Sequence, residues 1–251
     1  MKWLFPLGLF TLLACQPSHP TEIQMQSALA PMDSSIAGDA EVAALIAPYK
    51  EELDAKMNEV IGYTSAAFDN SGGPTRESTL GDFVADLLLE ESQSRIFINL
   101  DLAVINHHGG LRTSINKGDV TVRNIYELMP FENEMWILAL DGHHTQMLFD
   151  NAAKRKSNVI AGATFGIKDD TVATNIVING KPFDSTRTYL VSISDYLAGG
   201  GGGHGFLNEE MIMQDLNYRC RDMIIDHIRR VSGEKGDTLH PKIDGRVRIV
   251  E

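Results

Sequence analysis

Two glycine-rich segments carry residues whose types could recognise a small molecule. In the first, Gly109-Gly110 is followed by Arg112, and in the second the five glycines of residues 199–203 precede His204. Glycine lets the backbone approach a ligand closely, because no Cβ occupies the space. A nearby guanidinium can hold a phosphate or a carboxylate with two parallel hydrogen bonds. The first pattern also fits a tight turn beside a surface arginine, so by itself it leaves both interpretations open.

The segments around these glycines resemble one family. After the first pair comes Leu128-Met129-Pro130-Phe131, and before the second run comes Ser194-Asp195-Tyr196-Leu197-Ala198. Upstream, Arg76-Glu77-Ser78-Thr79-Leu80-Gly81-Asp82 opens an expected helix. Across roughly residues 61–207, these motifs together resemble the C-terminal, nucleotide-recognition domain of the 5′-nucleotidase family.

The resemblance implies a role for each matching residue. It makes Phe131 and Tyr196 two rings that hold a nucleobase between them, at about 1–3 kcal/mol per stacking contact. It makes Arg112 and Arg76 contacts for anionic or polar groups, the second near a helix N-terminus, which favours anions. Gly109-Gly110 would shape the pocket. Without the resemblance, Phe131 would be assigned to the core, and Arg76 fits a solvated surface position equally well.

The sequence departs from the family pattern at three positions. His107 stands where the family has Asn, although Asn106 lies one residue earlier, and Asp82 also replaces an Asn. His204 replaces the Asp that binds ribose hydroxyls in the family. A histidine can still hydrogen-bond a hydroxyl, so His107 and His204 are candidate substrate-binding residues. The grip of one carboxylate on two adjacent hydroxyls is lost, which admits a different phosphorylated or acidic ligand.

We predict no metal site and no catalytic residue in this chain. Adjacent histidines, as in His107-His108 and His143-His144, point in different directions, so each pair offers about one ligand. No carboxylate cluster typical of a two-metal phosphoesterase accompanies them, and the family's metal-binding motifs are not found. The divalent metals are therefore expected on a separate metallophosphatase chain. An autonomous hydrolase that uses these histidines is an alternative.

The first residues read as an export signal. Lys2 precedes a short apolar stretch, residues 3–14, which is too short to cross a bilayer. Leu12-Leu13-Ala14-Cys15 resembles a bacterial lipobox, in which lipid is attached to the cysteine. We expect a signal peptide over residues 1–14, a flexible tether over 15–38 and the domain over 39–251, anchored at a periplasmic or cell-surface membrane. A soluble signal peptide is the alternative. With lipid on Cys15, Cys220 has no disulfide partner and is expected to be a buried, inert thiol.

Composition and periodicity indicate the fold class. The chain has 251 residues, 43% of them hydrophobic, and a net charge of -12, which argues against nucleic-acid binding. Apolar periodicity and cap residues predict helices at 41–60, 80–91, from Asp141 to about 154 and at 219–231, with a short helix within 120–129. Strands are predicted at 61–68, 102–106, 135–140, 163–167, 175–178, 189–194 and 246–250. This alternation predicts an α+β or α/β domain, a mixed β-sheet with flanking helices.

The predicted function is recognition of a nucleotide, or of a related phosphorylated small molecule, within a split 5′-nucleotidase of nucleotide catabolism. In the family the catalytic metals lie on a preceding domain for which the chain has no room, so hydrolysis is expected from a separate metallophosphatase chain. A surface lipoprotein that captures its ligand without any hydrolase is the second hypothesis.

Overall fold

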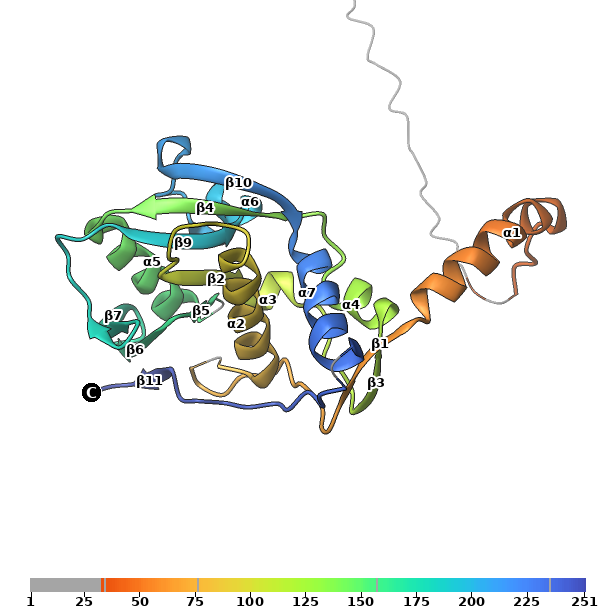
Figure 1. Ribbon diagram of the computed structural model, residues 1–251, viewed down its shortest axis with the longest axis horizontal. Coiled ribbons are helices and arrows are strands. Elements are labelled where there is room, and N and C mark those ends of the chain that lie inside the picture. The colour runs from red at the N-terminus through yellow and green to blue at the C-terminus, as the bar shows by residue number, and fades with distance from the viewer. Residues whose placement is uncertain (1–32, 34, 76, 157, 235) are drawn as a thin grey trace, which may run out of the picture. The chain divides into compact units, whose positions relative to one another are not determined.

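In the computed structural model of the protein, residues 33, 35–75, 77–156, 158–234 and 236–251 are described (Figure 1). The chain divides into two compact units, residues 1–46 and 47–251. The expected signal peptide, Cys15 and most of the expected tether lie outside the described residues, and so does Arg76. The domain boundaries predicted at residues 14 and 38 therefore stay predictions.

A five-stranded sheet lies at the centre of the second unit. Its strand order is β10 (Ile212–Arg219), β4 (Glu134–Leu140), β9 (Tyr189–Ser194), β2 (Leu102–Asn106) and β5 (Asn158–Ala161). β9 and β2 run parallel, whereas the other neighbours are antiparallel. The predicted class, a mixed sheet with flanking helices, is confirmed.

The two faces of this sheet belong to separate hydrophobic cores. Successive side chains of a strand point to opposite faces, and β2 shows this alternation: Leu102 and Val104 join one core, while Ala103 and Ile105 join the other. Helices α2 (Thr79–Gln93) and α7 (Cys220–Ile228) cover the face of Ala103 and Ile105. The opposite face packs against α5 (Gly142–Arg155).

A second sheet lies beyond α5 (Figure 1). Its strand order is β11 (Val247–Ile249), β6 (Ala163–Lys168), β7 (Val172–Ile178) and β8 (Lys181–Pro182). The C-terminal strand β11 runs parallel to β6, and the other pairs are antiparallel. The end of the chain is thereby held against a hairpin formed near its middle.

A third, two-stranded sheet pairs β1 (Val60–Thr64) with β3 (Gly118–Thr121), and α4 (Val122–Leu128) follows it. Before β1 runs α1 (Ala40–Met57), none of whose residues is buried. The remaining elements are short: α3 (His107–Gly110), α6 (Asp195–Ala198), the 3-10 helices Gly201–Gly203 and Glu209–Met211, and a π-helix over Arg229–Glu234. No helix in the described part of the chain is both long and apolar enough to span a bilayer.

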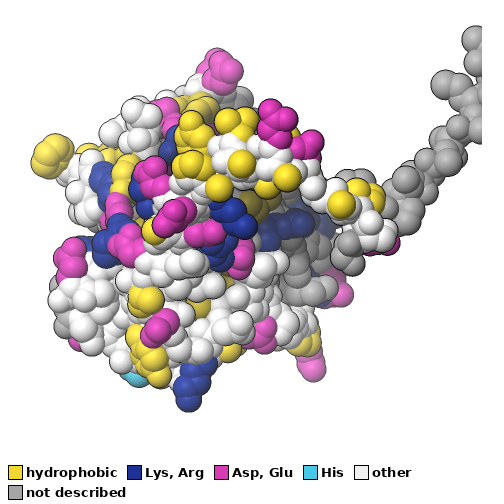
Figure 2. Space-filling view, turned by 90° about the vertical axis from the view of Figure 1, so that its right-hand side faces the viewer, with side chains coloured by type: hydrophobic (Ala, Val, Ile, Leu, Met, Phe, Trp, Pro, Cys, Tyr) yellow, Lys and Arg dark blue, Asp and Glu magenta, His cyan; other side chains and the backbone are white. Residues whose placement is uncertain are grey.

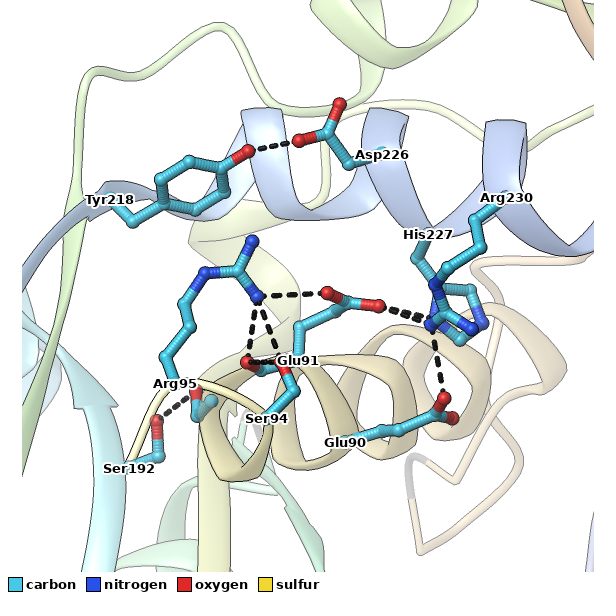
Figure 3. Close-up of polar contacts among 10 residues, drawn as sticks. Glu90, Glu91, Ser94, Arg95, Ser192, Tyr218, Asp226, His227 and Arg230 are labelled. Carbon is cyan, nitrogen blue, oxygen red and sulfur yellow. Dashed lines mark hydrogen bonds and ion pairs between the residues drawn. The ribbon is translucent and has the colours of Figure 1, made fainter. Parts of the chain in front are cut away.

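Helix α2 is bound to α7 by a buried carboxylate (Figure 3). Glu91 is 5% exposed and receives hydrogen bonds from Arg95 at 2.9 Å, from His227 at 3.1 Å and from Arg230. Burial alone would raise the pKa of Glu91, but the hydrogen bonds from Arg230, Arg95 and His227 together lower it. Ser92 of α2 also hydrogen-bonds Ser192 of β9 at 2.7 Å. These contacts fix α2 and α7 on the sheet.

Charges of both signs are interspersed on one face of the molecule. On the face drawn in Figure 2, Lys and Arg side chains lie among Asp and Glu side chains. Pairs such as Arg123–Asp54 at 2.8 Å and Arg229–Glu59 at 3.0 Å are partly exposed. Pairs of this kind contribute about 0–1 kcal/mol each, so the domain depends mainly on its hydrophobic cores.

Several boundaries differ from the sequence prediction. The strand expected over 61–68 ends at Thr64, and the helix expected over 219–231 ends at Ile228, where the π-helix begins. The Gly109-Gly110 pair lies in one turn of helix, α3, and not in an irregular loop. Strands β5, β8 and β10 were not predicted. β10 is an edge strand with no fully buried residue; Ile212, Leu216 and Tyr218 are half-buried, but Gln214 and two register shifts interrupt their alternation.

Candidate functional site

A cavity of about 500 Å³ lies beside the ends of β2 and β9. Because these two strands are parallel, their carboxyl ends meet at the same edge of the sheet, a common position for ligand sites in α/β folds. The cavity is lined by α2, β2, α3, the α4–β4 loop, the start of β4, the end of β9, α6 and the start of α7. The lining residues are Leu88, Val104, Ile105, Gly109, Gly110, Met129, Phe131, Glu132, Asn133, Met135, Ser194, Asp195, Tyr196 and Cys220.

The two predicted aromatic residues both line this cavity. Phe131 is 37% exposed and Tyr196 is 52% exposed, so neither belongs to a hydrophobic core. Assigning Phe131 to the core would therefore have been wrong. Gly109 and Gly110 lie in the same cavity wall. The structure thus brings four of the eight predicted ligand-binding residues together, while a ligand held between the rings stays a prediction.

A buried arginine holds the loop that carries Phe131. Arg221 is 3% exposed, and its guanidinium donates to the carbonyl oxygen of Phe131 at 3.1 Å and to Glu132 Oε1 at 2.6 Å. It also lies 4.1 Å from the ring centre of Tyr126 in α4. Arg219, which is half exposed, pairs with the other oxygen of Glu132 at 2.7 Å. Two charged side chains at the start of α7 therefore fix the backbone of Phe131.

Glycines hold the ring of Tyr196. A Cβ on Gly201 would lie 2.5 Å from Tyr196 Cζ and 2.5 Å from the Tyr196 carbonyl oxygen, so the ring packs directly on the glycine backbone. The N–H of Gly202 donates to the Tyr196 hydroxyl at 3.3 Å. Gly200, Gly202 and Gly203 have φ of 93°, 57° and 83°, a region that favours glycine. The run of glycines is therefore needed for this arrangement.

The two loops are joined across the cavity wall. Asn133 Nδ2, two residues after Phe131, donates to Asp195 Oδ1 at 2.8 Å, and Asp195 immediately precedes Tyr196. At the start of α6, Ser194 Oγ accepts from the N–H of Leu197 at 3.4 Å. The bond between Asn133 and Asp195 ties the Phe131 loop to the Tyr196 loop directly.

His204 lies behind the glycine run, outside the lining of the cavity. Its side chain is completely buried; Nδ1 donates to the Gly201 carbonyl at 2.9 Å, and Nε2 accepts from Asn151 Nδ2 at 3.2 Å. Burial lowers the pKa of the imidazole, which favours the neutral ring that these two bonds require. Arg155 packs against Gly203 on the same side. His204 therefore supports the glycine run. It is not one of the residues that line the cavity, so its contact with a ligand hydroxyl stays a prediction.

The structure does not place the predicted cationic residues in the cavity wall. Arg112 is exposed, its backbone N–H donates to the Leu128 carbonyl at 2.8 Å, and it is not among the lining residues. Arg76 lies outside the described residues, and so does the side chain of His107. Among the described residues that line the cavity, none is Lys or Arg, and two are acidic, Glu132 and Asp195. Contacts of Arg112, Arg76 and His107 with an anion stay predictions.

Cys220 contributes its thiol to the cavity wall. Burial raises the pKa of this thiol to about 12, and the thiolate is the reactive form of cysteine. The side chain therefore acts as a small apolar surface, as expected from the sequence.

Among the residues of the site and its supports that were not selected from the sequence are Asn133, Asp195, Cys220 and Arg221. Asn133 and Asp195 stand next to the aromatic motifs, so their neighbourhood was a usable signal. Arg221 offers none, because its bonds to Phe131 and Glu132 span 90 and 89 residues.

Two groups of carboxylates and histidines in the described residues could approach a metal ion. One is Glu90, Glu91 and His227, and the other is Glu77, Asp82 and Asp244. Neither group lines the cavity between Phe131 and Tyr196.

The family model of the 5′-nucleotidase C-terminal domain matches residues 60–209. The trifunctional nucleotide phosphoesterase protein YfkN of Bacillus subtilis is 25% identical over 240 residues, which cover 88% of this chain and 16% of YfkN. Protein UshA of Yersinia enterocolitica is 26% identical over 195 residues, which cover 71% of this chain and 34% of UshA.

Solved structures share the fold. The 5′-nucleotidase precursor from Thermus thermophilus matches with a TM-score of 0.71 at 22% identity, over 84% of this chain and 43% of that one. The NAD nucleotidase NadN of Haemophilus influenzae matches with a TM-score of 0.63 at 21% identity, over 84% and 41% of the two chains. The chain thus spans less than half the length of each of these relatives.

Proposed function

The chain belongs to the family of 5′-nucleotidase C-terminal domains, and on this premise we propose that its cavity recognises the base and sugar of a nucleotide. The observation that carries the proposal is the position of Phe131 and Tyr196. Phe131 stands on the loop before β4 and Tyr196 on α6, these two segments are tied together by Asn133 and Asp195, and both partly exposed residues line one cavity. Aromatic walls of this kind stack on the flat face of a base with little dependence on its identity.

The remaining lining supports a neutral portion of the ligand. Leu88, Ile105 and Met135 offer apolar surface, while Asn133 and Ser194 offer hydrogen-bonding groups. The charge of Glu132 is compensated by Arg221 and Arg219, whereas Asp195 has no cationic partner among the described lining residues and would repel a phosphate in this volume, although it can accept hydrogen bonds from hydroxyl or amino groups. We therefore propose that the phosphate points out of the cavity, where Arg112, Arg76 and His107 are the candidate contacts.

For hydrolysis we propose a separate metallophosphatase chain that would receive the exposed phosphate. Export and a lipid anchor on Cys15 would place this chain at the membrane, where the partner would have to meet it. A Cys15→Ser chain should then leave the membrane fraction, and unchanged partitioning would remove the anchor from the proposal.

Phosphate release from AMP by the purified chain with added Mg²⁺ or Mn²⁺, lost in His107→Ala, would instead favour the autonomous hydrolase. A ligand-binding lipoprotein without hydrolase is favoured if no phosphatase co-purifies with the chain.

The recognition step is tested by calorimetric titration of adenosine and AMP. If both rings stack on the base, Phe131→Ala and Tyr196→Ala should each weaken binding by about 1–3 kcal/mol, with little change in the urea midpoint. Phe97, fully exposed at 109% and outside the cavity lining, offers a matched control, and Phe97→Ala should bind as the parent does. Equal affinity in the parent, Phe131→Ala and Tyr196→Ala would rule out the stacking role.

A further inference from the structure

A second polar centre lies where the C-terminal segment meets the beginning of α2 (Figure 1). Glu77 Oε1 accepts from the backbone N–H of Gly245 at 2.8 Å and of Arg246 at 3.3 Å, and Glu77 Oε2 accepts from that of Val247 at 3.3 Å. These bonds tie the residue before the N-cap of α2 to the start of β11. None of the residues involved lines the nucleotide cavity.

Asp82, in the first turn of α2, is buried here without a hydrogen-bond partner among the described residues. It is 2% exposed, both carboxylate oxygens are inaccessible, and neither accepts a hydrogen bond from the described part of the chain. Arg246 Nε lies 3.5 Å from Asp82 Oδ1, but the guanidinium is already held by two bonds to Asp86 at 2.8 Å and by two to Asp244 at 3.0 and 2.7 Å. A buried carboxylate left without hydrogen bonds is costly, so this position calls for a further partner.

The charge around Asp82 is not balanced by the described side chains. Glu77 and, in the lining of a cavity of about 220 Å³, Asp82, Asp86 and Asp244 bring four negative charges when ionised. Arg246 and Lys242 of the same lining stand against them, whereas Glu90, a further carboxylate of this lining, is already paired with Arg230 at 3.0 Å. Four negative and two positive charges leave two negative charges. A divalent cation would neutralise this excess.

The oxygen atoms are also close enough to share one ion. Glu77, Asp82 and Asp244 each offer one carboxylate oxygen, and these atoms lie within 4.8 Å of one another. Calcium binds oxygen ligands at about 2.3–2.6 Å in flexible geometry, so two ligands on opposite sides of one ion lie about 5 Å apart. Hard carboxylate oxygens suit Ca²⁺ or Mg²⁺ and not a softer metal.

We propose that Glu77, Asp82 and Asp244 bind one Ca²⁺ ion, which joins the first turn of α2 to the segment that leads into β11. Calcium is preferred to Mg²⁺ because the three carboxylates belong to an irregular segment and a helix end, which do not enforce an octahedron. The ion stabilises the docking of β11 on β6 and takes no part in the nucleotide cavity.

A proton is the competing occupant of this centre. Burial, opposed by the charge of Arg246 and reinforced by that of Glu77, raises the pKa of Asp82 to about 8. Without a cation, a neutral Asp82 that shares its proton with Glu77 would also remove part of the excess charge. Only a measurement with the metal separates the two states.

The test is calcium binding by the purified protein after EDTA treatment and dialysis. We expect one Ca²⁺ per chain in equilibrium dialysis and a melting temperature that rises by on the order of 3 °C in 5 mM CaCl₂, since a ligand of the folded state stabilises by mass action. Asp82→Asn and Asp244→Asn should each lower the affinity at least about tenfold. Asp170→Asn, which removes an exposed carboxylate paired with Lys156 away from the cavity, should keep full binding.

Two results would overturn the proposal. One is a parent protein whose melting temperature and bound calcium are the same with and without 5 mM CaCl₂, the result expected of a proton shared by Asp82 and Glu77. The other is calcium binding that persists undiminished in both Asp82→Asn and Asp244→Asn. If Asp82→Asn does not fold, the calcium stoichiometry of the parent and the affinity of Asp244→Asn decide.

Discussion

The two aromatic walls of the cavity are fixed by different means. Phe131 stands on a loop whose backbone is held by the buried guanidinium of Arg221, a side chain from α7. Tyr196 packs on the backbone of Gly201 and accepts a hydrogen bond from Gly202. One wall therefore depends on charged side chains that reach across the fold, and the other on the absence of side chains within its own loop.

The two mechanisms respond differently to substitution. The Phe131 loop, which is held by side chains, can lose one of these contacts and still relax, because side-chain torsions and water can adjust to the gap. A ring packed against a backbone cannot adjust in this way, since a side chain added at Gly201 would meet both the ring and the carbonyl oxygen of Tyr196, and the backbone itself must then move. We therefore expect the Tyr196 wall to be the less tolerant of the two.

The largest effect is expected from Gly201→Ala. Its Cβ would lie 2.5 Å from both the ring and the carbonyl oxygen of Tyr196, so the loop must shift. We expect a loss of about 3 kcal/mol in the free energy of unfolding, at the upper end for overpacking, together with weaker nucleotide binding. Gly205→Ala is the matched control, because a Cβ there meets no atom within 4 Å. Urea unfolding of both variants makes the measurement, and equal stabilities would show that the Tyr196 wall is not held by close packing.

A smaller effect is expected from Arg221→Ala. The variant loses charge-assisted hydrogen bonds to Phe131 and Glu132 and the contact with Tyr126, which we expect to cost about 2 kcal/mol of unfolding free energy. Arg219→Ala is the control, because Arg219 pairs with the same Glu132 but is half exposed, so its loss should cost about 0–1 kcal/mol. If both variants unfold at the same urea concentration, burial of Arg221 adds nothing and the Phe131 loop is held by other contacts.

The same contrast explains what could be predicted from the sequence. Helices α2 and α5 were predicted because their caps and apolar spacing are local: Ser78 accepts from Gly81 at 3.0 Å and Asp141 from His144 at 2.8 Å, both three residues apart. The glycine support of Tyr196 is local as well, which is why the run of glycines pointed to the site. Strand β10 was missed, because Gln214 and the register shifts beside it break the apolar alternation of Ile212, Leu216 and Tyr218.

Contacts that join segments distant in the chain could not be predicted from the sequence. Arg221 reaches a loop 90 residues away, and its own neighbourhood gives no sign of that partner. The bond between Asn133 and Asp195 spans 62 residues in the same way. His204 was selected as a candidate, but its place behind the glycine run depends on Asn151 in α5, 53 residues earlier. The sequence thus indicated the walls of the cavity, and the fold determined what supports them.

The smallest effect concerns pH and the support of the Tyr196 wall by His204. Because burial lowers the pKa of His204 in the folded protein, the unfolded chain takes up a proton first as the pH falls. The stability that the neutral ring provides is therefore fully present above its unfolded pKa of about 6.5 and is lost as the pH falls below it. The slope of unfolding free energy against pH is at most about 1.4 kcal/mol per pH unit, and we expect a loss of about 1 kcal/mol between pH 7.5 and pH 5.5.

His204→Asn keeps an uncharged donor and acceptor for Gly201 and Asn151 but does not titrate, so urea unfolding of parent and variant across this range isolates the contribution of His204. The parent should lose stability relative to the variant as the pH falls. Parallel curves would mean that His204 becomes protonated in place, and that the glycine run tolerates a charged ring behind it.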